Sequence, residues 1–277
     1  MYLSLNGTLV AGRVPWPDFA RLAARTGYPG VDLDLAKAFA EGFPATRTLL
    51  DQLKLKPAVA GLPVEFRKED EIFQKDLEKL EPAAHFAAAL GCPRMTTWLM
   101  PSSNTPKVRL RTLYLKRFRA CAEILARSQV RLGFEFISPL HLRKMYPHEF
   151  IWRMPEMVAF AKECGPNCGV LLDSWHWHHA GGTPEDIIQA GKQGIVHAQV
   201  NDAARQSPEE VRDDERLMPG EGVINLTGFF AALKEIGYEG GVSVEVFGRG
   251  LKDMPPEQGA RLGLETGRDV MRKAGVL

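Results

Sequence analysis

The stretches GVLLD at residues 169–173 and IVHAQV at residues 195–200 are short, mostly apolar runs, and each has the length of a buried parallel strand. Further runs of this kind occur before and after them, and longer amphipathic segments separate most neighbouring runs. We therefore predict eight strands, at residues 2–5, 31–35, 57–62, 95–100, 132–137, 169–173, 195–200 and 242–247.

The longer segments carry apolar residues at helical spacing and predict helices at residues 16–26, 68–90, 107–128, 227–236 and 257–274. Strands that alternate with helices form βαβ units around a parallel sheet. Eight such units in 277 residues predict an α/β protein, a single-domain (β/α)₈ barrel over residues 1–277. The polar and charged stretch at residues 202–222 is expected to be an excursion over the mouth of this barrel.

An open, doubly wound sheet is the structural alternative. Its dinucleotide fingerprint places G-x-G-x-x-G directly after the first strand, whereas residues 6–13 read NGTLVAGR. No phosphate-binding loop of the Walker type occurs elsewhere in the sequence. These two absences favour the closed barrel.

The composition is that of an ordinary globular protein and limits the kinds of partner. Lys plus Arg number 35 and Asp plus Glu 34, so the net charge of +1 lacks the basic excess of proteins held to nucleic acid by phosphate contacts. The four cysteines are too few for a disulfide framework, and we expect free thiols. No apolar run approaches the ~20 residues of a membrane span, and the N-terminus lacks signal-peptide features, so we expect a cytoplasmic protein.

Polar side chains lie late in four successive predicted strands, where the functional groups of such barrels gather. They are Glu135, Asp173, Gln199, with His197 two residues earlier, and Glu245. A charge in an apolar strand is costly unless it is paired or bound to a metal ion. The sequence thus predicts that these side chains meet around the barrel axis.

Two explanations account for this polar set. One is an internal salt-bridge network or strand-end capping, although the four strands contain no Lys or Arg placed to pair with three acids. The other is a bound divalent cation. Three carboxylates and one amide offer only oxygen ligands, which favours one Mn²⁺ or Mg²⁺ ion and leaves Co²⁺ and Zn²⁺ open.

Four segments resemble motifs of the xylose-isomerase-like barrel superfamily of sugar isomerases and epimerases. They are GVLLDSWH (169–176), HAQVND (197–202), RLMPGEG (216–222) and GYEGGVSVE (237–245). Together they span roughly residues 130–250, whereas the first half of the chain is similar mainly in its alternation of strands and helices.

The resemblance implies roles for individual residues. It makes Glu135, Asp173, Gln199 and Glu245 the metal ligands, and it makes Glu135 and Glu245 the catalytic acid and base. His176 and Arg216 would hold substrate oxygens. Many relatives carry His at the place of Gln199, whereas the hydroxypyruvate-isomerase branch carries Gln, and His197 is the alternative ligand.

The resemblance predicts a metal-dependent isomerase or epimerase of a small sugar or hydroxy-ketone, which would remove a proton beside the carbonyl to form a metal-bound cis-enediolate. A dehydratase or lyase acting on a keto-sugar or keto-cyclitol through the same site is the alternative. An apurinic-site endonuclease is disfavoured, because residues 58–63 and 95–100 lack the additional His ligands. A non-catalytic sugar-binding barrel is disfavoured by the intact pair of acids. We expect a sugar or keto-acid substrate and no nucleic-acid or membrane partner, and a homo-oligomer is left open.

Overall fold

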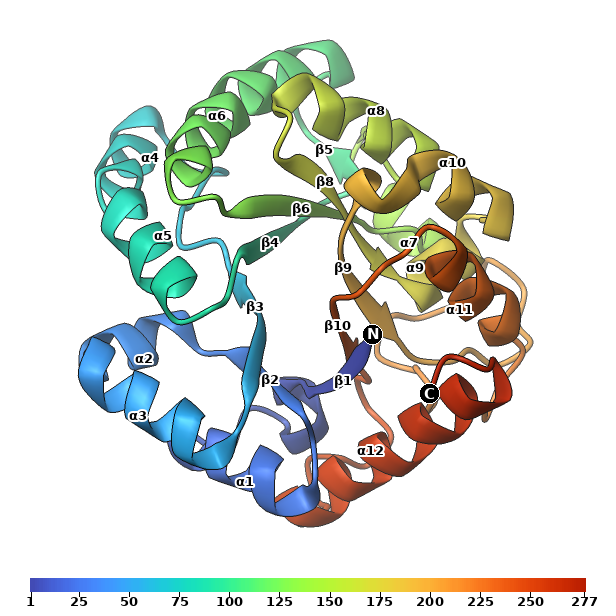
Figure 1. Cartoon of the computed structure of the whole chain (residues 1–277). Helices are drawn as coiled ribbons and strands as arrows, with labels where there is room; N and C mark the ends of the chain where they lie inside the picture. Colours follow the sequence, from blue (N-terminus) through green and yellow to red (C-terminus); the bar gives the residue numbers. More distant parts are fainter.

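Eight parallel strands close into a barrel in the computed structural model, which describes all 277 residues (Figure 1). Each strand pairs with its neighbours in chain order, and the first strand pairs with the last. The predicted barrel is therefore confirmed. Its strands are β1 (Tyr2–Leu5), β2 (Gly30–Leu33), β3 (Lys56–Gly61), β4 (Arg94–Leu99), β6 (Arg131–Phe136), β8 (Cys168–Asp173), β9 (Ile195–Val200) and β10 (Gly241–Val244).

Helices surround the barrel on the outside (Figure 1). The helix predicted at residues 68–90 is two helices, because the ring of Pro82 would clash with the carbonyl of Glu78 in a continuous helix. The outer helices are α1 (Asp18–Thr26), α2 (Leu35–Glu41), α3 (Phe43–Leu53), α4 (Asp70–Leu77), α5 (Leu80–Ala89), α6 (Lys107–Arg127), α8 (Met154–Cys164), α10 (Pro184–Gly194), α11 (Leu226–Glu235) and α12 (Pro256–Lys273).

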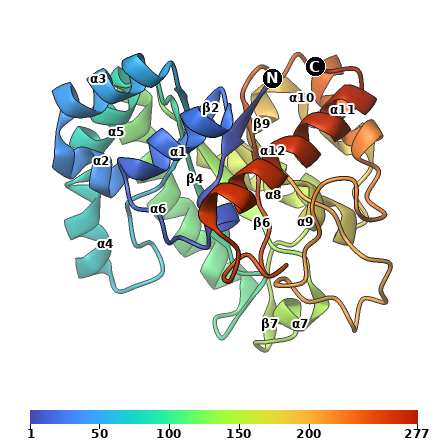
Figure 2. The ribbon, with the colours of Figure 1, turned by 90° about the horizontal axis from the view of Figure 1, so that it is seen from below.

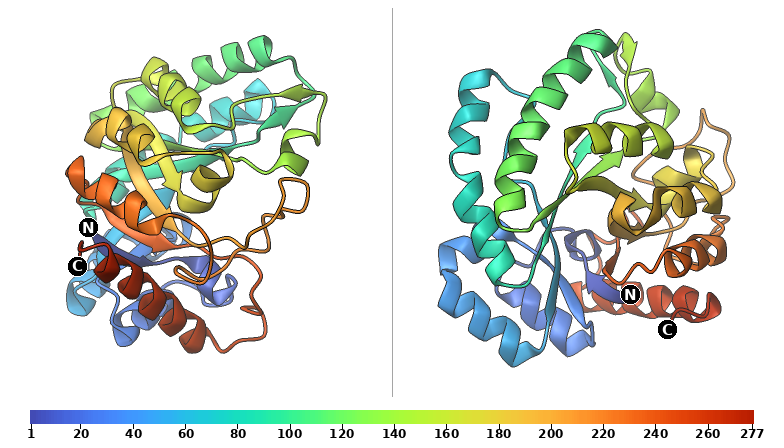
Figure 3. Two further views of the ribbon diagram at one scale, coloured as in Figure 1. Left: turned by 90° about the vertical axis from the view of Figure 1, so that its right-hand side faces the viewer. Right: turned by 45° about the horizontal axis from the view of Figure 1, so that its top comes forward.

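The two ends of the barrel differ. Both termini lie at one end, and short elements in the connections that follow the strands lie at the other (Figure 2). The long connection between β9 and α11, predicted as an excursion, projects at this second end in Figure 3. The short elements are η1 (Gly7–Val10), α7 (Leu140–Arg143), α9 (Ser174–His179) and the small sheet of β5 (Ser102–Ser103) and β7 (His148–Glu149).

Packing around β6 shows how the core orients a polar side chain inward. Phe134 packs against Phe118 of α6 and Phe160 of α8, with ring centroids 4.7 and 5.6 Å away. Because side chains alternate along a strand, Glu135 then points into the barrel. The four cysteines are buried and free, and no helix is both long and apolar enough to span a membrane.

Candidate active site

A cavity of about 440 Å³ lies at the C-terminal end of the barrel and has a polar and an apolar side. Trp98 and Phe247 are 47% and 37% exposed, so they are available to contact a ligand. The polar lining residues are Glu135, His176, Asp213, Arg216 and Glu245, and the apolar ones are Trp98, Met100, Ile137, Leu142 and Phe247.

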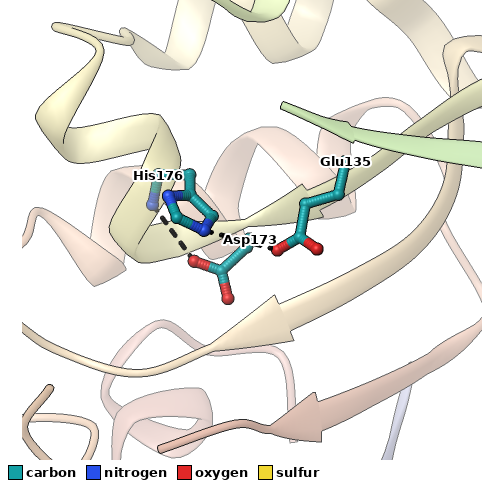
Figure 4. Close-up of side chains that lie close together, drawn as sticks. All are labelled: Glu135, Asp173 and His176. Carbon is teal, nitrogen blue, oxygen red and sulfur yellow. Dashed lines mark hydrogen bonds and ion pairs between the residues drawn. The ribbon is translucent and has the colours of Figure 1, made fainter. Parts of the chain in front are cut away.

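Glu135 is the one acid of this cavity wall that no protein group hydrogen-bonds. Its Oε1 lies 3.6 Å from Nε2 of His176, beyond hydrogen-bond distance, and both side chains point toward Asp173 in Figure 4. Burial raises the pKa of Glu135 well above its ordinary value, and the nearby charges of Glu245 and Asp173 raise it further. The Glu135 carboxylate therefore keeps its lone pairs free for a ligand.

Asp173 is held by donors on both of its oxygens. Oδ1 accepts the backbone N–H groups of Trp175 and His176, at 2.8 and 3.1 Å, so this side chain caps α9. Oδ2 accepts from the Asn201 amide at 2.9 Å, and the same amide donates to the backbone carbonyl of Glu245 at 3.0 Å. Asn201 thus joins the ends of β8 and β10, a role that the sequence did not reveal.

Gln199 and Glu245 form a pair beside Asp173. The Gln199 amide nitrogen donates to Oε1 of Glu245 at 2.8 Å, and Oε1 of Gln199 is buried with no hydrogen-bond partner. Glu245 follows the end of β10, although its backbone N–H still donates to Val200 at 3.1 Å. Burial raises the pKa of Glu245 to about 7, and the positive charge of Arg216 opposes that rise.

Arg216 supplies the cation that the strands lack. Its side chain is 1% exposed, and Nη1 donates to Asp173 Oδ2 and to Glu245 Oε2, each at 3.1 Å. Nη2 donates to Asp213 at 2.8 Å and contacts Nε2 of His176 at 3.1 Å, and Nε donates to Asp213 at 3.2 Å. A guanidinium has five N–H groups, so every one of them is engaged within the protein.

His176 is neutral in this arrangement. Burial, followed by the charge of Arg216, lowers its pKa to about 4. A guanidinium only donates, so Nε2 of His176 is the acceptor in its contact with Arg216. Nδ1 lies 3.3 Å from the backbone nitrogen of Ser138, which donates to it, and 3.4 Å from the hydroxyl of Ser138.

The loop that carries Arg216 is fixed at its base by Asp202, which explains the segment RLMPGEG. Asp202 pairs with Leu217 through two backbone hydrogen bonds, and its carboxylate accepts the N–H groups of Gly220 and Ile224 at 3.0 and 2.9 Å. Gly220 has φ +89°, and a Cβ on Gly222 would lie 2.2 Å from the carbonyl oxygen of Ala203. Both glycines are therefore required where they stand.

Comparison with known proteins identifies the family. The family model described as xylose isomerase-like TIM barrel matches residues 11–273. The chain belongs to this family. Its predicted assignment to the xylose-isomerase-like superfamily is confirmed.

Relatives and solved structures extend the likeness over the chain. An inosose isomerase of Halalkalibacterium halodurans is 25% identical over 81% of this chain and 80% of its own. A 3-dehydroshikimate dehydratase of Pseudomonas putida is 26% identical over 70% of this chain and 29% of its own. A xylose isomerase domain protein from Alicyclobacillus acidocaldarius superposes with a TM-score of 0.92, at 31% identity over 99% of both chains. The IOLI protein, solved with a zinc atom, gives 0.83 at 20% identity over 99% of both chains. The first two of these relatives are enzymes, an isomerase and a dehydratase, in agreement with the predicted class of protein.

A divalent cation fits the groups of this xylose isomerase-like barrel. The orphaned Oε1 of Gln199 is an acceptor that lacks a donor, and a cation would satisfy it. Candidate ligand atoms of Glu135, Asp173 and His176 all lie within 4.8 Å of one another. Arg216 alone leaves these acids with surplus negative charge, which a divalent ion would reduce.

This compact cluster differs in one respect from the ligand set that the resemblance implies. It includes His176, expected to bind substrate, whereas Glu245 is engaged by Gln199 and Arg216. The structure thus gathers all six predicted site residues at one end of the barrel, and their division into ligands and substrate-binding groups stays a prediction.

His197, the alternative ligand, lies one layer below the cavity. Its Nε2 lies 2.9 Å from the hydroxyl of Ser243, which donates to Asp32 at 2.8 Å. Ser4 and Asn6 donate to Asp32 as well, at 2.7 and 2.9 Å. Burial raises the pKa of Asp32 to about 6. Sequence reasoning missed this network, because no motif joins these positions.

His197 makes the stability of the barrel depend on pH. Burial lowers its pKa to about 3, so on acidification the unfolded chain takes up the proton first and the folded state loses stability below pH 6.5. Between pH 7 and pH 5, His197 should lower the free energy of unfolding by about 2 kcal/mol. His197→Gln should remove this loss, because glutamine does not titrate and its amide can still donate to Ser243. Urea unfolding at both pH values measures the difference. An equal loss of stability in wild type and variant would contradict the prediction.

Proposed function

We propose that the chain is a metal-dependent isomerase or epimerase of a small sugar or hydroxy-ketone. The observation that carries this proposal is Glu135, a buried carboxylate with no hydrogen-bond donor that lines the cavity beside Asp173. Such a group can take a proton from carbon. The inosose isomerase among the relatives supports the same class of reaction.

We propose that Glu135, Asp173, Gln199 and Glu245 hold one Mn²⁺ or Mg²⁺ ion. Oxygen donors favour these ions over zinc, although the related IOLI protein was solved with zinc. When bound, the ion would polarise a carbonyl and so reduce the free energy needed to remove the neighbouring proton.

The protein groups divide the proton transfers between them. Glu135 accepts the proton from carbon, because its oxygens are free and its raised pKa makes it a stronger base than an ordinary carboxylate. Glu245 is the second glutamate that lines the cavity, and it can return a proton. Return to the same carbon gives an epimer, and return to the neighbouring carbon gives an aldose–ketose isomer. Trp98 and Phe247 form the apolar wall that limits water near the reacting carbon.

Elimination is the second candidate, because the first proton removal is the same. A dehydratase would expel a substituent next to the new negative charge, and one relative of this chain is a dehydratase. The two outcomes leave different products. The near-neutral charge and the small cavity favour an enzyme of small molecules in either case.

One experiment separates these reactions. The Mg²⁺-loaded protein is incubated in D₂O with a panel of aldoses, ketoses, inososes and keto acids, and the products are followed by NMR. We expect deuterium at the carbon beside the carbonyl without elimination. A new carbon–carbon double bond would establish a lyase, and the absence of both changes across the panel would reject catalysis on these substrates.

Replacement of the amide ligand should change the choice of metal. In Gln199→His an imidazole nitrogen takes the place of the orphaned amide oxygen, so we expect the preference for Zn²⁺ over Mn²⁺ to rise about tenfold, or about 1.4 kcal/mol. Equilibrium dialysis with both ions measures this ratio. His197→Ala is the control and should keep the wild-type ratio. Loss of metal from that control, with retention in Gln199→Ala, would make His197 the ligand.

A further inference from the structure

Arg216 has no free N–H group with which to bind a substrate. All five donors end on Asp173, Glu245, Asp213 and His176. Its guanidinium also lies 4.7 Å from the ring centroid of Phe247, which covers it on the side of the cavity. A substrate oxygen can therefore reach this group only after one of its present partners has left.

The position of Nη1 between two acids suggests a role for Arg216. We propose that Arg216 is an internal counter-cation, which joins Asp173 to Glu245 in the metal-free protein and competes with the divalent ion for these two carboxylates. The inference rests on the proposed metal site and assigns to that site a residue that regulates its occupancy.

Geometry makes the competition direct. Nη1 lies 3.1 Å from Oδ2 of Asp173 and 3.1 Å from Oε2 of Glu245. A Mg²⁺ ion lies about 2.1 Å from its oxygen ligands, so an ion on the same two oxygens would bring two positive groups into contact. Like charges at such a distance repel strongly in a buried site. We therefore expect binding of the ion to displace Nη1.

Asp213 gives the displaced guanidinium a second partner. It lies three residues before Arg216 on the same loop and already accepts from both Nε and Nη2. Its side chain is 34% exposed, whereas that of Asp173 is fully buried, so Asp213 lies toward the rim of the cavity. Arg216 can move toward this rim without losing its contact with an acid.

Displacement would also change what Arg216 offers to a ligand. The two N–H groups of Nη1 would turn from the carboxylates to the cavity, where a carbonyl or hydroxyl oxygen of the substrate can accept them. The metal ion and the substrate should then bind with positive coupling, the ion favouring the conformation that holds substrate. Arg216 would thus bind substrate only when the ion is present.

Two measurements test the proposal. Crystals of the wild-type protein with and without Mn²⁺ should show Nη1 within 3.5 Å of both acids only in the metal-free form. Titration with Mn²⁺ should give a Kd about tenfold lower for Arg216→Gln than for the wild type, a change in the ordinary range for coupled sites. The melting temperature of the metal-free variant should fall, because two buried acids lose their shared cation. Arg212→Gln is the matched control, since Arg212 is exposed on the same loop and contacts only backbone carbonyls.

The outcomes distinguish this proposal from the metal site itself. Metal-bound crystals with Nη1 still between the two acids would overturn the counter-cation role, and this test needs no variant to fold. An unchanged Kd in Arg216→Gln would overturn it as well. If neither the wild type nor the variant binds Mn²⁺ or Mg²⁺, the proposed metal site is rejected, and the proposed competition is rejected with it. Metal binding by Arg216→Gln but not by the wild type would support the proposal that Arg216 competes with the ion.

Discussion

Glu135→Gln should lower kcat on the proposed substrate by about 10²–10⁴-fold, the usual contribution of a general base. The amide cannot accept a proton from carbon, whereas its oxygen can still ligate a metal ion. Because Glu135 has no protein hydrogen-bond donor, the substitution should leave folding almost unchanged. Steady-state kinetics measure the loss of kcat, and the melting temperature shows whether stability is retained. Glu209→Gln, an exposed position on the loop over the cavity, is the matched control and should keep wild-type kcat.

The partner acid provides a further distinction. In Glu245→Gln, Glu135 can still remove the proton, so this variant should exchange the substrate's α-proton with D₂O while it forms little product. Glu135→Gln should do neither. Full isomerase activity in both variants would reject a mechanism based on two carboxylates and leave a hydroxide as the base.

Asp173→Ala should have the largest effect on stability, about 3–5 kcal/mol, the usual cost of removing one member of a buried ion pair. Four donors would lose their acceptor, among them the amide of Asn201 and the guanidinium of Arg216. We also expect the variant to lose the bound metal. Urea unfolding and metal analysis of the purified protein measure the two effects.

Asp173→Asn separates the two losses. It keeps the size of the side chain and one acceptor oxygen, so it should be more stable than Asp173→Ala yet bind metal poorly. A full complement of metal in Asp173→Ala would remove Asp173 from the ligand set.

The positions of the strands were the most predictable part of the molecule. β1 and β9 have the predicted bounds, and the other barrel strands begin one residue earlier than predicted. The largest differences are at the ends of β2 and β10, at Leu33 and Val244, two and three residues earlier than predicted. Period-two alternation and burial fix which side chains enter a barrel, so Glu135, Asp173, Gln199 and Glu245 could be placed together from sequence alone.

Contacts made by loops and by small residues could not be predicted in the same way. Arg216 lies in a charged run whose composition is typical of a solvated loop. The hydrogen bonds between Asp202 and Leu217 help to place it beside Asp173. The network of Ser4, Asp32 and Ser243 joins three strands that are distant in sequence. Individually such residues carry no signal, because their role depends on the closure of the barrel. Helices α2, α3, α8 and α10 were also not predicted.

The hydrogen bonds of Asp202 divide the loop over the cavity into two parts that differ in their tolerance to sequence change. Hydrogen bonds to Asp202 and Ala203 fix residues 217–224, whereas residues 205–210 are exposed. Exposed loop segments accept replacement and insertion far better than segments with buried contacts. Residues 205–210 are therefore a suitable place to introduce new sequence at the rim of the cavity while Arg216 keeps its position.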